Sequence, residues 1–361
     1  MATMKFSRRQ AMTGVVGAVS AATACSNSPT PSAPNVSKWA PRVSENIGNL
    51  DESTLRWMTQ LGLKFVVLQG TDSVDSDGKG FWSTDDIEAV KQRCEAFDLQ
   101  LHSLMLPFDW LIDSMLGEPD RDRDIENIRT SISAAGAAGV SVVEWRWSPD
   151  FKWGADVGYY SKPGRGGATY KAFDYDRVRE APPFQELGRI SREELLERLL
   201  YFANNVMSAA EASNVKMSLH PKDPPVAEMR GISRLITNTD EIESFLDAVP
   251  SPANGFTFCQ GTVTEMGVDV IDAIRRIGGR GKIHHVHFRA VRGSVPRYEE
   301  TFIDEGDVDM LAAMRAYKQV GYEHAIVSDH SPSIPNDLPG GKIGRSFSHG
   351  YIRGLLQAVN A

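Results

Sequence analysis

Short apolar runs alternate with amphipathic segments of helical period from about residue 39 to the end of the chain. Each run has the length of one β-strand, and each amphipathic segment is long enough to connect two parallel strands. Eight such pairs in strict order favour a (β/α)₈ TIM barrel. The strands are expected at residues 39–43, 64–69, 99–106, 140–147, 215–220, 255–260, 282–288 and 325–329.

The helices are expected at residues 51–61, 84–97, 121–138, 191–213, 240–249, 268–277, 308–320 and 345–359. The fifth helix starts with S-R-E-E (191–194), a pattern typical of a capping box. A doubly wound open sheet is the structural alternative, but it usually has fewer units and a glycine-rich phosphate loop after its first strand. No such loop follows residues 39–43. We expect the strands to be apolar on both faces, as buried parallel strands usually are.

One long segment, residues 148–188, interrupts the alternation. It is rich in glycine and aromatic residues and shows no convincing period, so we expect an irregular insertion that covers a site. Its composition suits a lid and a subunit contact equally, so a homo-oligomer is one possible assembly.

The first 24 residues have the features of an export signal. Arg8 and Arg9 precede an apolar run of 14 residues (11–24), which is too short for a membrane-spanning helix. This resembles a bacterial twin-arginine signal. Cys25 follows A-T-A as in a lipoprotein processing site, so we consider a lipid anchor at Cys25 and an ordinary signal peptide with an incidental cysteine. We expect an exported protein, periplasmic or anchored on the outer side of the membrane, with a flexible tether at 25–37 and one catalytic domain at 38–361.

The overall charge limits the partners. A formal net charge of −8 argues against a nucleic-acid-binding surface. Beyond Cys25, the chain holds Cys94 and Cys259, which do not make a disulfide framework.

Four consecutive predicted strands end in side chains that can bind a metal: His220, Cys259, His287 and Asp329. Neighbouring barrel strands converge, so these side chains can reach one point at the C-terminal face. Taken singly, each has another interpretation, such as packing for Cys259 or hydrogen bonding for His220. Together, the mixed N, S and O donors favour a divalent Mn, Fe, Co or Zn ion, and among these we expect Mn²⁺ or Fe²⁺.

The residues around these positions resemble the motifs of the mannonate dehydratase family. They are H-P-K-D-P-P (220–225), S-P-A-N-G-F-T-F-C-Q-G-T (251–262), I-H-H-V-H-F-R (283–289), D-E-G-D-V-D-M (304–310) and S-D-H (328–330). The resemblance implies a xylose-isomerase-like barrel. It also implies that the substrate is a small sugar acid, D-mannonate, which loses water to give 2-keto-3-deoxy-D-gluconate.

The same resemblance implies roles for individual residues. The four strand-end side chains match the family's metal ligands. His330 matches a catalytic residue, Arg289 an arginine near the substrate carboxylate, and Asp223 lies in the matching proline-rich loop.

The chain also departs from the family pattern. The family's catalytic tyrosine falls at about Ser348, and His349 is a candidate replacement, with a surface histidine as the alternative. Ala290 and Arg146 stand where the family has asparagines. These differences at positions expected to surround the substrate are consistent with a changed substrate specificity or with a loss of activity. The alternatives are therefore a sugar isomerase or epimerase of the same barrel superfamily, and a non-catalytic sugar-binding lipoprotein.

Overall fold

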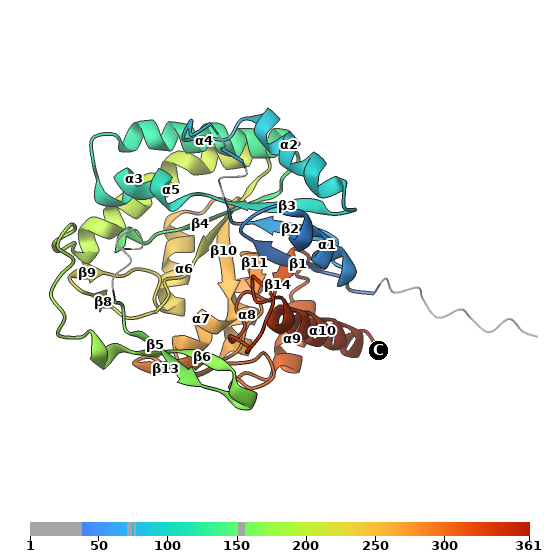
Figure 1. Cartoon of the computed structure of the whole chain (residues 1–361). Coiled ribbons are helices and arrows are strands. Elements are labelled where there is room, and N and C mark those ends of the chain that lie inside the picture. The colour runs from blue at the N-terminus through green and yellow to red at the C-terminus, as the bar shows by residue number, and fades with distance from the viewer. Residues whose placement is uncertain (1–37, 71–73, 76, 151–155) are drawn as a thin grey trace, which may run out of the picture. The chain divides into compact units, whose positions relative to one another are not determined.

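Eight parallel strands close into a barrel at the centre of the computed structural model (Figure 1). The structure describes residues 38–70, 74–75, 77–150 and 156–361. The barrel order is β1-β14-β11-β10-β7-β4-β3-β2, which confirms the predicted (β/α)₈ barrel. Its strands are β1 (Arg42–Ile47), β2 (Phe65–Leu68), β3 (Gln100–Met105), β4 (Val142–Arg146), β7 (Lys216–His220), β10 (Asn254–Cys259), β11 (Ile283–His287) and β14 (Ala325–Val327).

The chain divides between Lys38 and Trp39, and Trp39–Ala361 is the unit that holds the barrel. The predicted export signal, the lipid anchor at Cys25 and the tether at 25–37 lie outside the described residues. None of the helices that the structure describes has the length and apolar character needed to cross a membrane.

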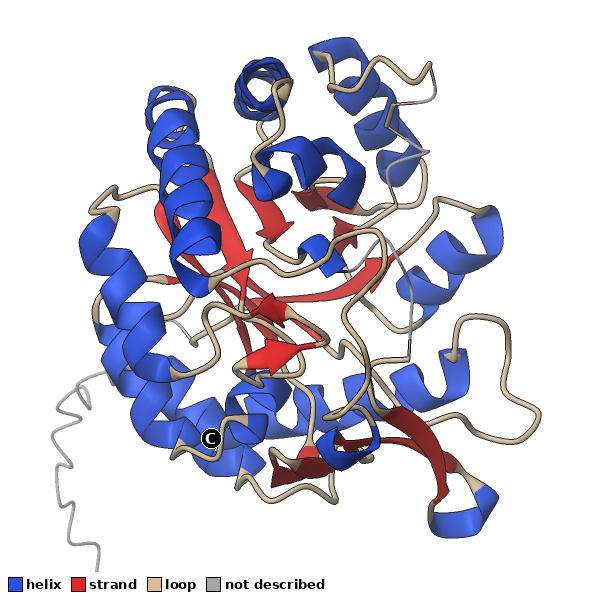
Figure 2. Ribbon diagram, turned by 90° about the vertical axis from the view of Figure 1, so that its left-hand side faces the viewer, coloured by secondary structure: helices blue, strands red, loops and turns tan. Residues whose placement is uncertain are grey.

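Helices surround the strands (Figure 2). They are α1 (Glu52–Gln60), α2 (Thr84–Glu95), α3 (Ile112–Leu116), α4 (Arg121–Ala137), α5 (Arg192–Ala212), α6 (Thr239–Ala248), α7 (Gln260–Glu265), α8 (Val270–Gly279), α9 (Met310–Gln319) and α10 (Lys342–Val359). The predicted capping box of α5 is confirmed: the Glu194 N–H donates to the Ser191 hydroxyl, and the Ser191 N–H donates to the Glu194 carboxylate at 2.9 Å. Such a cap stabilises a helix by about 1 kcal/mol.

The main hydrophobic core lies between the strands and the helices. Trp145 of β4 is fully buried, with ring centroids 5.1 Å from Phe202 of α5 and 6.4 Å from Phe245 of α6. Because side chains alternate along a strand, the neighbours of Trp145, Glu144 and Arg146, point to the inside of the barrel.

The inside of the barrel carries polar side chains where β3, β4, β7, β10 and β11 line it. Ser103 donates to Glu144 at 2.8 Å, and the Ser218 and Thr257 hydroxyls lie 2.8 Å apart. His285 is fully buried in the same interior. The expectation that the strands are apolar on both faces is therefore wrong for β3, β4, β7, β10 and β11, whose inward positions carry these groups.

The predicted first strand, 39–43, is displaced from the observed β1, Arg42–Ile47. Ser44, Glu45 and Asn46 interrupt the apolar pattern, yet all three are buried. The Glu45 carboxylate accepts hydrogen bonds from Ser328 at 2.5 Å and from Arg345 at 2.7 Å. A carboxylate that is compensated in this way can be buried, which a scan for apolar runs does not detect.

A second, four-stranded antiparallel sheet lies beyond the barrel, in the order β12-β13-β6-β5 (Figure 1). It joins β5 (Tyr159–Pro163) and β6 (Thr169–Asp174) to β12 (Val291–Ser294) and β13 (Arg297–Glu300). The prediction of an irregular segment at 148–188 is wrong for β5 and β6, because these strands form a hairpin whose second strand, β6, pairs with β13 more than 100 residues later. A small hairpin of β8 (Glu228–Met229) and β9 (Ile232–Ser233) completes the strands.

Candidate active site

The C-terminal ends of β4, β7, β10 and β11 place four inward side chains at one level of the barrel. Arg146 pairs in register with His220, and Cys259 pairs in register with His287. Since residues in register on neighbouring parallel strands point the same way, the arginine, the two imidazoles and the thiol face a common space.

Three of the predicted ligands converge. One potential ligand atom each from His220, Cys259 and His287 lies within 4.8 Å of the others. Asp329 joins them from the end of β14, with Oδ1 3.4 Å from His287 Nδ1 and Oδ2 3.9 Å from Cys259 Sγ. Asp329 has φ of 57°, a left-handed conformation that aspartate tolerates better than most residues. The structure thus brings together all four side chains that the sequence singled out.

The electrostatics of Cys259 and the hydrogen bonding of His220 suit metal binding. Burial raises the pKa of the Cys259 thiol, but the Arg289 guanidinium and His220 more than offset this and hold the pKa well below its usual range. The thiolate is the form that binds metals. His220 Nδ1 lies 2.6 Å from the Pro221 carbonyl oxygen, so Nδ1 carries the proton and Nε2 remains available.

His287 supplies a test of whether this group fits a metal. The imidazole is fully buried, and neither ring nitrogen makes a hydrogen bond within the described part of the chain. A buried polar group without a partner is costly. Two imidazoles, a thiolate and a carboxylate fit a divalent transition metal better than Ca²⁺ or Mg²⁺. The residues therefore form a possible metal-binding group.

A second possible ligand group lies one level deeper, formed by Glu144, His285 and His287. Glu144 Oε2 is 3.8 Å from His287 Nε2, on the side of the imidazole away from Asp329. Burial tends to raise the pKa of Glu144, but His285 and His287 lower it to about 2. A carboxylate behind a metal-binding imidazole orients the ring, so Glu144 is placed to orient His287.

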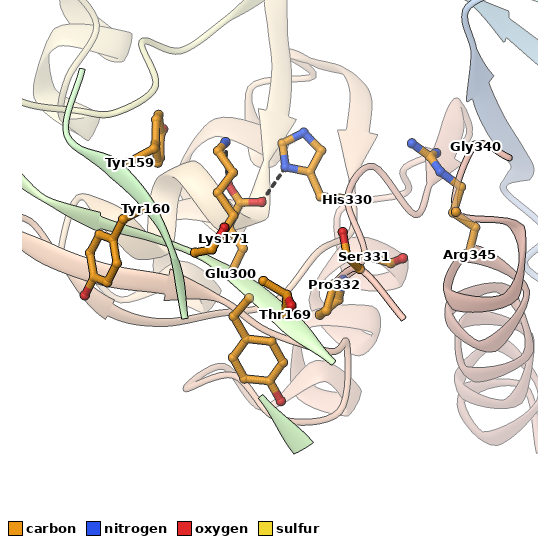
Figure 3. A pocket seen from close by; sticks show the side chains of 14 residues that line it. Tyr159, Tyr160, Thr169, Lys171, Glu300, His330, Ser331, Pro332, Gly340 and Arg345 are labelled. Atoms are coloured by element: carbon orange, nitrogen blue, oxygen red, sulfur yellow. Dashed lines mark hydrogen bonds and ion pairs between the residues drawn. The ribbon is translucent and has the colours of Figure 1, made fainter. Parts of the chain in front are cut away.

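The small sheet also reaches this site. His330 follows Asp329, and its Nδ1 lies 2.7 Å from Oε2 of Glu300, the last residue of β13. Lys171 of β6 contacts the other carboxylate oxygen of Glu300 at 2.9 Å. Figure 3 shows Lys171, Glu300 and His330 side by side, with Arg345 across the cavity at the start of α10. Lys171 and Glu300 were not predicted as site residues, since the sequence does not predict the strands that carry them.

Two adjoining cavities open at this face, and both are lined by Tyr159, Lys171 and His330. The metal lobe, about 470 Å³, also contacts His220 and Asp329. The outer lobe, about 590 Å³, extends towards Arg345 (Figure 3). Each lobe has room for a small polar ligand.

Arg289 and Asp223, the predicted substrate-binding residues, lie together. Arg289 Nη2 donates to Asp223 Oδ2 at 2.7 Å, and Nη1 donates to Glu265 at 2.9 Å. Its Nε lies 2.9 Å from Asp329 Oδ2. Asp223 lines the metal lobe, whereas Arg289 is 2% exposed and lines neither lobe. The predicted role of Arg289 stays a prediction, but its guanidinium is already bound to three carboxylates.

His349 is neither a surface residue nor a residue that lines a lobe. It is 1% exposed, and its Nε2 lies 2.8 Å from Glu45 Oε2. Glu45 alternates with the inward positions of β1, so this pair lies between the barrel wall and α10. Ser348 is also buried and donates to the Gly344 carbonyl within α10 at 3.2 Å. The prediction that His349 takes the place of the family's tyrosine is therefore corrected. His349 packs against the outer side of the barrel strand β1 and does not line the cavity.

The closed barrel and the strand-end ligand group together define a TIM-barrel protein with a possible metal centre. A solved structure has the same barrel: a xylose isomerase domain protein from Alicyclobacillus acidocaldarius superposes with a TM-score of 0.62 at 12% identity, covering 89% of this chain and 100% of that one. At this identity the likeness shows the fold alone.

Sequence comparisons identify the family. The family model for D-mannonate dehydratase (UxuA) matches residues 177–361. A mannonate dehydratase of Enterococcus faecalis is 33% identical over 319 residues, 78% of this chain and 87% of its own. The crystal structure of mannonate dehydratase from Streptococcus suis has a TM-score of 0.79 at 28% identity, over 88% of this chain and 93% of that one. The chain belongs to the mannonate dehydratase family.

Proposed function

We propose that the protein removes water from D-mannonate, or from a closely related aldonate, to give a 2-keto-3-deoxy sugar acid. The observation that carries this proposal is the convergence of His220, Cys259, His287 and Asp329 beside His330, at one cavity of a chain in this family. The reaction removes the proton on C2 and the hydroxyl on C3, and the resulting enol becomes the 2-keto product.

We propose Mn²⁺ or Fe²⁺ as the ion, held by the two imidazoles, the thiolate and the Asp329 carboxylate. Bound there, it supplies Lewis-acid stabilisation for the negative charge that develops next to the substrate carboxylate when the C2 proton leaves. The surrounding residues do the remaining work, which is to orient the sugar acid and to move protons.

We propose that His330 is the general acid or general base of the reaction. It lines both lobes, and its Nδ1 is held by Glu300, which leaves Nε2 facing the metal group 3.6 Å from Asp329 Oδ1. An imidazole held in this way exchanges a proton at Nε2. In this reaction it either accepts the C2 proton or donates a proton to the departing C3 hydroxyl, which then leaves as water.

A panel of aldonates tests this function. The purified protein is loaded with Mn²⁺, or with Fe²⁺ under anaerobic conditions, and supplied with D-mannonate, D-gluconate and other aldonates, and with neutral ketoses. We expect a 2-keto-3-deoxy product from D-mannonate or a near relative. Interconversion of a ketose with no dehydration of any aldonate would establish an isomerase or epimerase, and binding without turnover of any compound would establish a sugar-binding protein.

We further propose that the reaction takes place outside the cytoplasm, on the basis of Arg8, Arg9 and the apolar run that follows them. Replacing both arginines by lysine should leave full-length precursor in the cytoplasm. A change in mobility on inhibition of lipoprotein processing would distinguish lipidation at Cys25 from ordinary cleavage. Equal export of both forms would contradict the twin-arginine route.

A further inference from the structure

Arg146 is a cation of the metal lobe for which the described residues provide no counter-ion. It stands at the end of β4, in register with His220, and it lines the same cavity as His220, Asp329 and His330. Its guanidinium lies 5.9 Å from the centre of the Phe108 ring. Within the described residues, Arg146 forms no ion pair and donates no side-chain hydrogen bond. The residues outside the described ranges (1–37, 71–73, 76 and 151–155) include one acidic residue, Asp72.

Four other basic side chains of this lobe already form ion pairs with carboxylates. Lys171 and His330 both contact Glu300, at 2.9 and 2.7 Å. Lys222 and Arg234 share the carboxylate of Asp150, at 2.6 and 2.5 Å. Each of these basic groups therefore already contacts a carboxylate, whereas Arg146 contacts none of the described carboxylates and is free to attract an anion into the lobe.

Arg289 does not meet this need. It is buried beneath the lobe and held by Asp223, Glu265 and Asp329. Removing it from these carboxylates to bind a substrate would leave buried charges unpaired, which is strongly unfavourable. The anion of a sugar acid therefore needs a different partner.

We propose that Arg146 is the carboxylate-binding residue of the metal lobe and selects a sugar acid over a neutral sugar. A guanidinium presents two parallel N–H groups that match the two oxygens of a carboxylate. The Phe108 ring lies within cation–π distance of the guanidinium and has no oxygen or nitrogen atom that would occupy its N–H groups. This inference rests on the proposed function and deepens it, because it names the residue that binds the negatively charged carboxylate of the substrate.

Binding to the Mn²⁺-loaded protein tests this role independently of turnover. Calorimetry would compare D-mannonate with D-mannitol, which has the same carbon chain without the carboxylate. Arg146→Gln should weaken D-mannonate binding about 10- to 100-fold, the range for loss of a charge-assisted hydrogen bond, and leave D-mannitol binding unchanged. Arg146→Lys should recover part of the loss. Arg315→Gln, on the exposed face of α9, is the matched control for the change in net charge.

The outcomes separate this inference from the proposed function. Retention of D-mannonate affinity in Arg146→Gln would overturn the inference, as would an equal loss of both ligands, which indicates a structural defect. Tight D-mannonate binding that depends on Arg146, without any keto product, would overturn the proposed dehydration and support the role of Arg146. A wild-type protein that binds D-mannitol as well as D-mannonate would overturn the assigned selectivity.

Discussion

Glu300 Oε2 lies 2.7 Å from His330 Nδ1. The two residues come from different parts of the fold: His330 follows the last barrel strand, while Glu300 ends β13 of the small sheet. The small sheet therefore does more than cover the barrel, because one of its carboxylates fixes the imidazole that we place at proton transfer.

We predict that Glu300→Gln lowers kcat for aldonate dehydration by about 10- to 100-fold. The amide keeps the size of the side chain but no longer holds the imidazole with a charge, and the loss should be smaller than the roughly 10²- to 10⁴-fold contribution of a general acid or base. Steady-state kinetics with saturating metal measures the effect. Glu299→Gln is the matched control, since Glu299 pairs with Lys162 and Arg292 instead. Equal losses in both variants would show that only the stability of the sheet matters.

The two histidines considered for catalysis should behave differently. His330→Ala should lower kcat by about 10²- to 10⁴-fold with unchanged metal content. His349→Gln should reduce stability, by about 1–3 kcal/mol, because it disturbs the buried contact with Glu45, and should leave kcat within a factor of a few. Kinetics and chemical denaturation of the same preparations compare the two. Full activity of His330→Ala would remove this residue from the mechanism.

The barrel and the ligand group were predictable because their signals are local. Strand length, helical period and capping residues lie within short windows, and His220, Cys259, His287 and Asp329 each end such a window. Their metal-binding and catalytic roles stay predictions. Glu300 and Lys171 were not predicted, because β6 and β13 belong to two hairpins that pair with each other across a long stretch of sequence.

Buried polar residues explain the other differences. Glu45 lies in the observed β1 but beyond the end of the predicted first strand, and Glu144 lies between the apolar residues Val143 and Trp145 of β4. Each is stabilised by partners from distant strands or helices. Apolar periodicity carries no information on such partners, although a lone glutamate inside a buried strand does indicate that a compensating group is required.

Glu144 leads to a prediction about metal affinity. Its Oε2 lies 3.8 Å from His287 Nε2, so we expect it to orient the imidazole. Glu144→Gln should weaken binding of Mn²⁺ by about 10- to 100-fold, as is typical when the partner of a metal-binding histidine is removed. Competition with a chelator measures the affinity without an activity assay. Glu193→Gln, at the exposed start of α5, serves as the control, and unchanged affinity in Glu144→Gln would contradict this role.

Asp150 should contribute strongly to stability. It is 4% exposed and contacts two buried cations, Lys222 at 2.6 Å and Arg234 at 2.5 Å. Asp150→Asn leaves both cations without a counter-charge, which should cost about 3–5 kcal/mol of unfolding free energy. Burial, together with Arg234, already lowers the pKa of Lys222 to about 8 despite Asp150, so loss of this carboxylate should lower it further.

The contribution of Asp150 should also depend on pH with a definite sign. Burial raises the pKa of this carboxyl, but Lys222 and Arg234 more than offset it and hold the pKa below the ordinary value of 3.8. A group whose pKa is lower in the folded state binds its proton more readily when unfolded. Its stabilisation is therefore fully present above that ordinary value and is lost as the pH falls below it. Urea unfolding of the wild type and Asp150→Asn should show a difference that is large at about pH 5 and shrinks in more acidic buffer. Asp176→Asn, which removes an exposed ion-paired carboxylate, should change stability little, and a loss as large as that of Asp150→Asn would show that burial is not the cause.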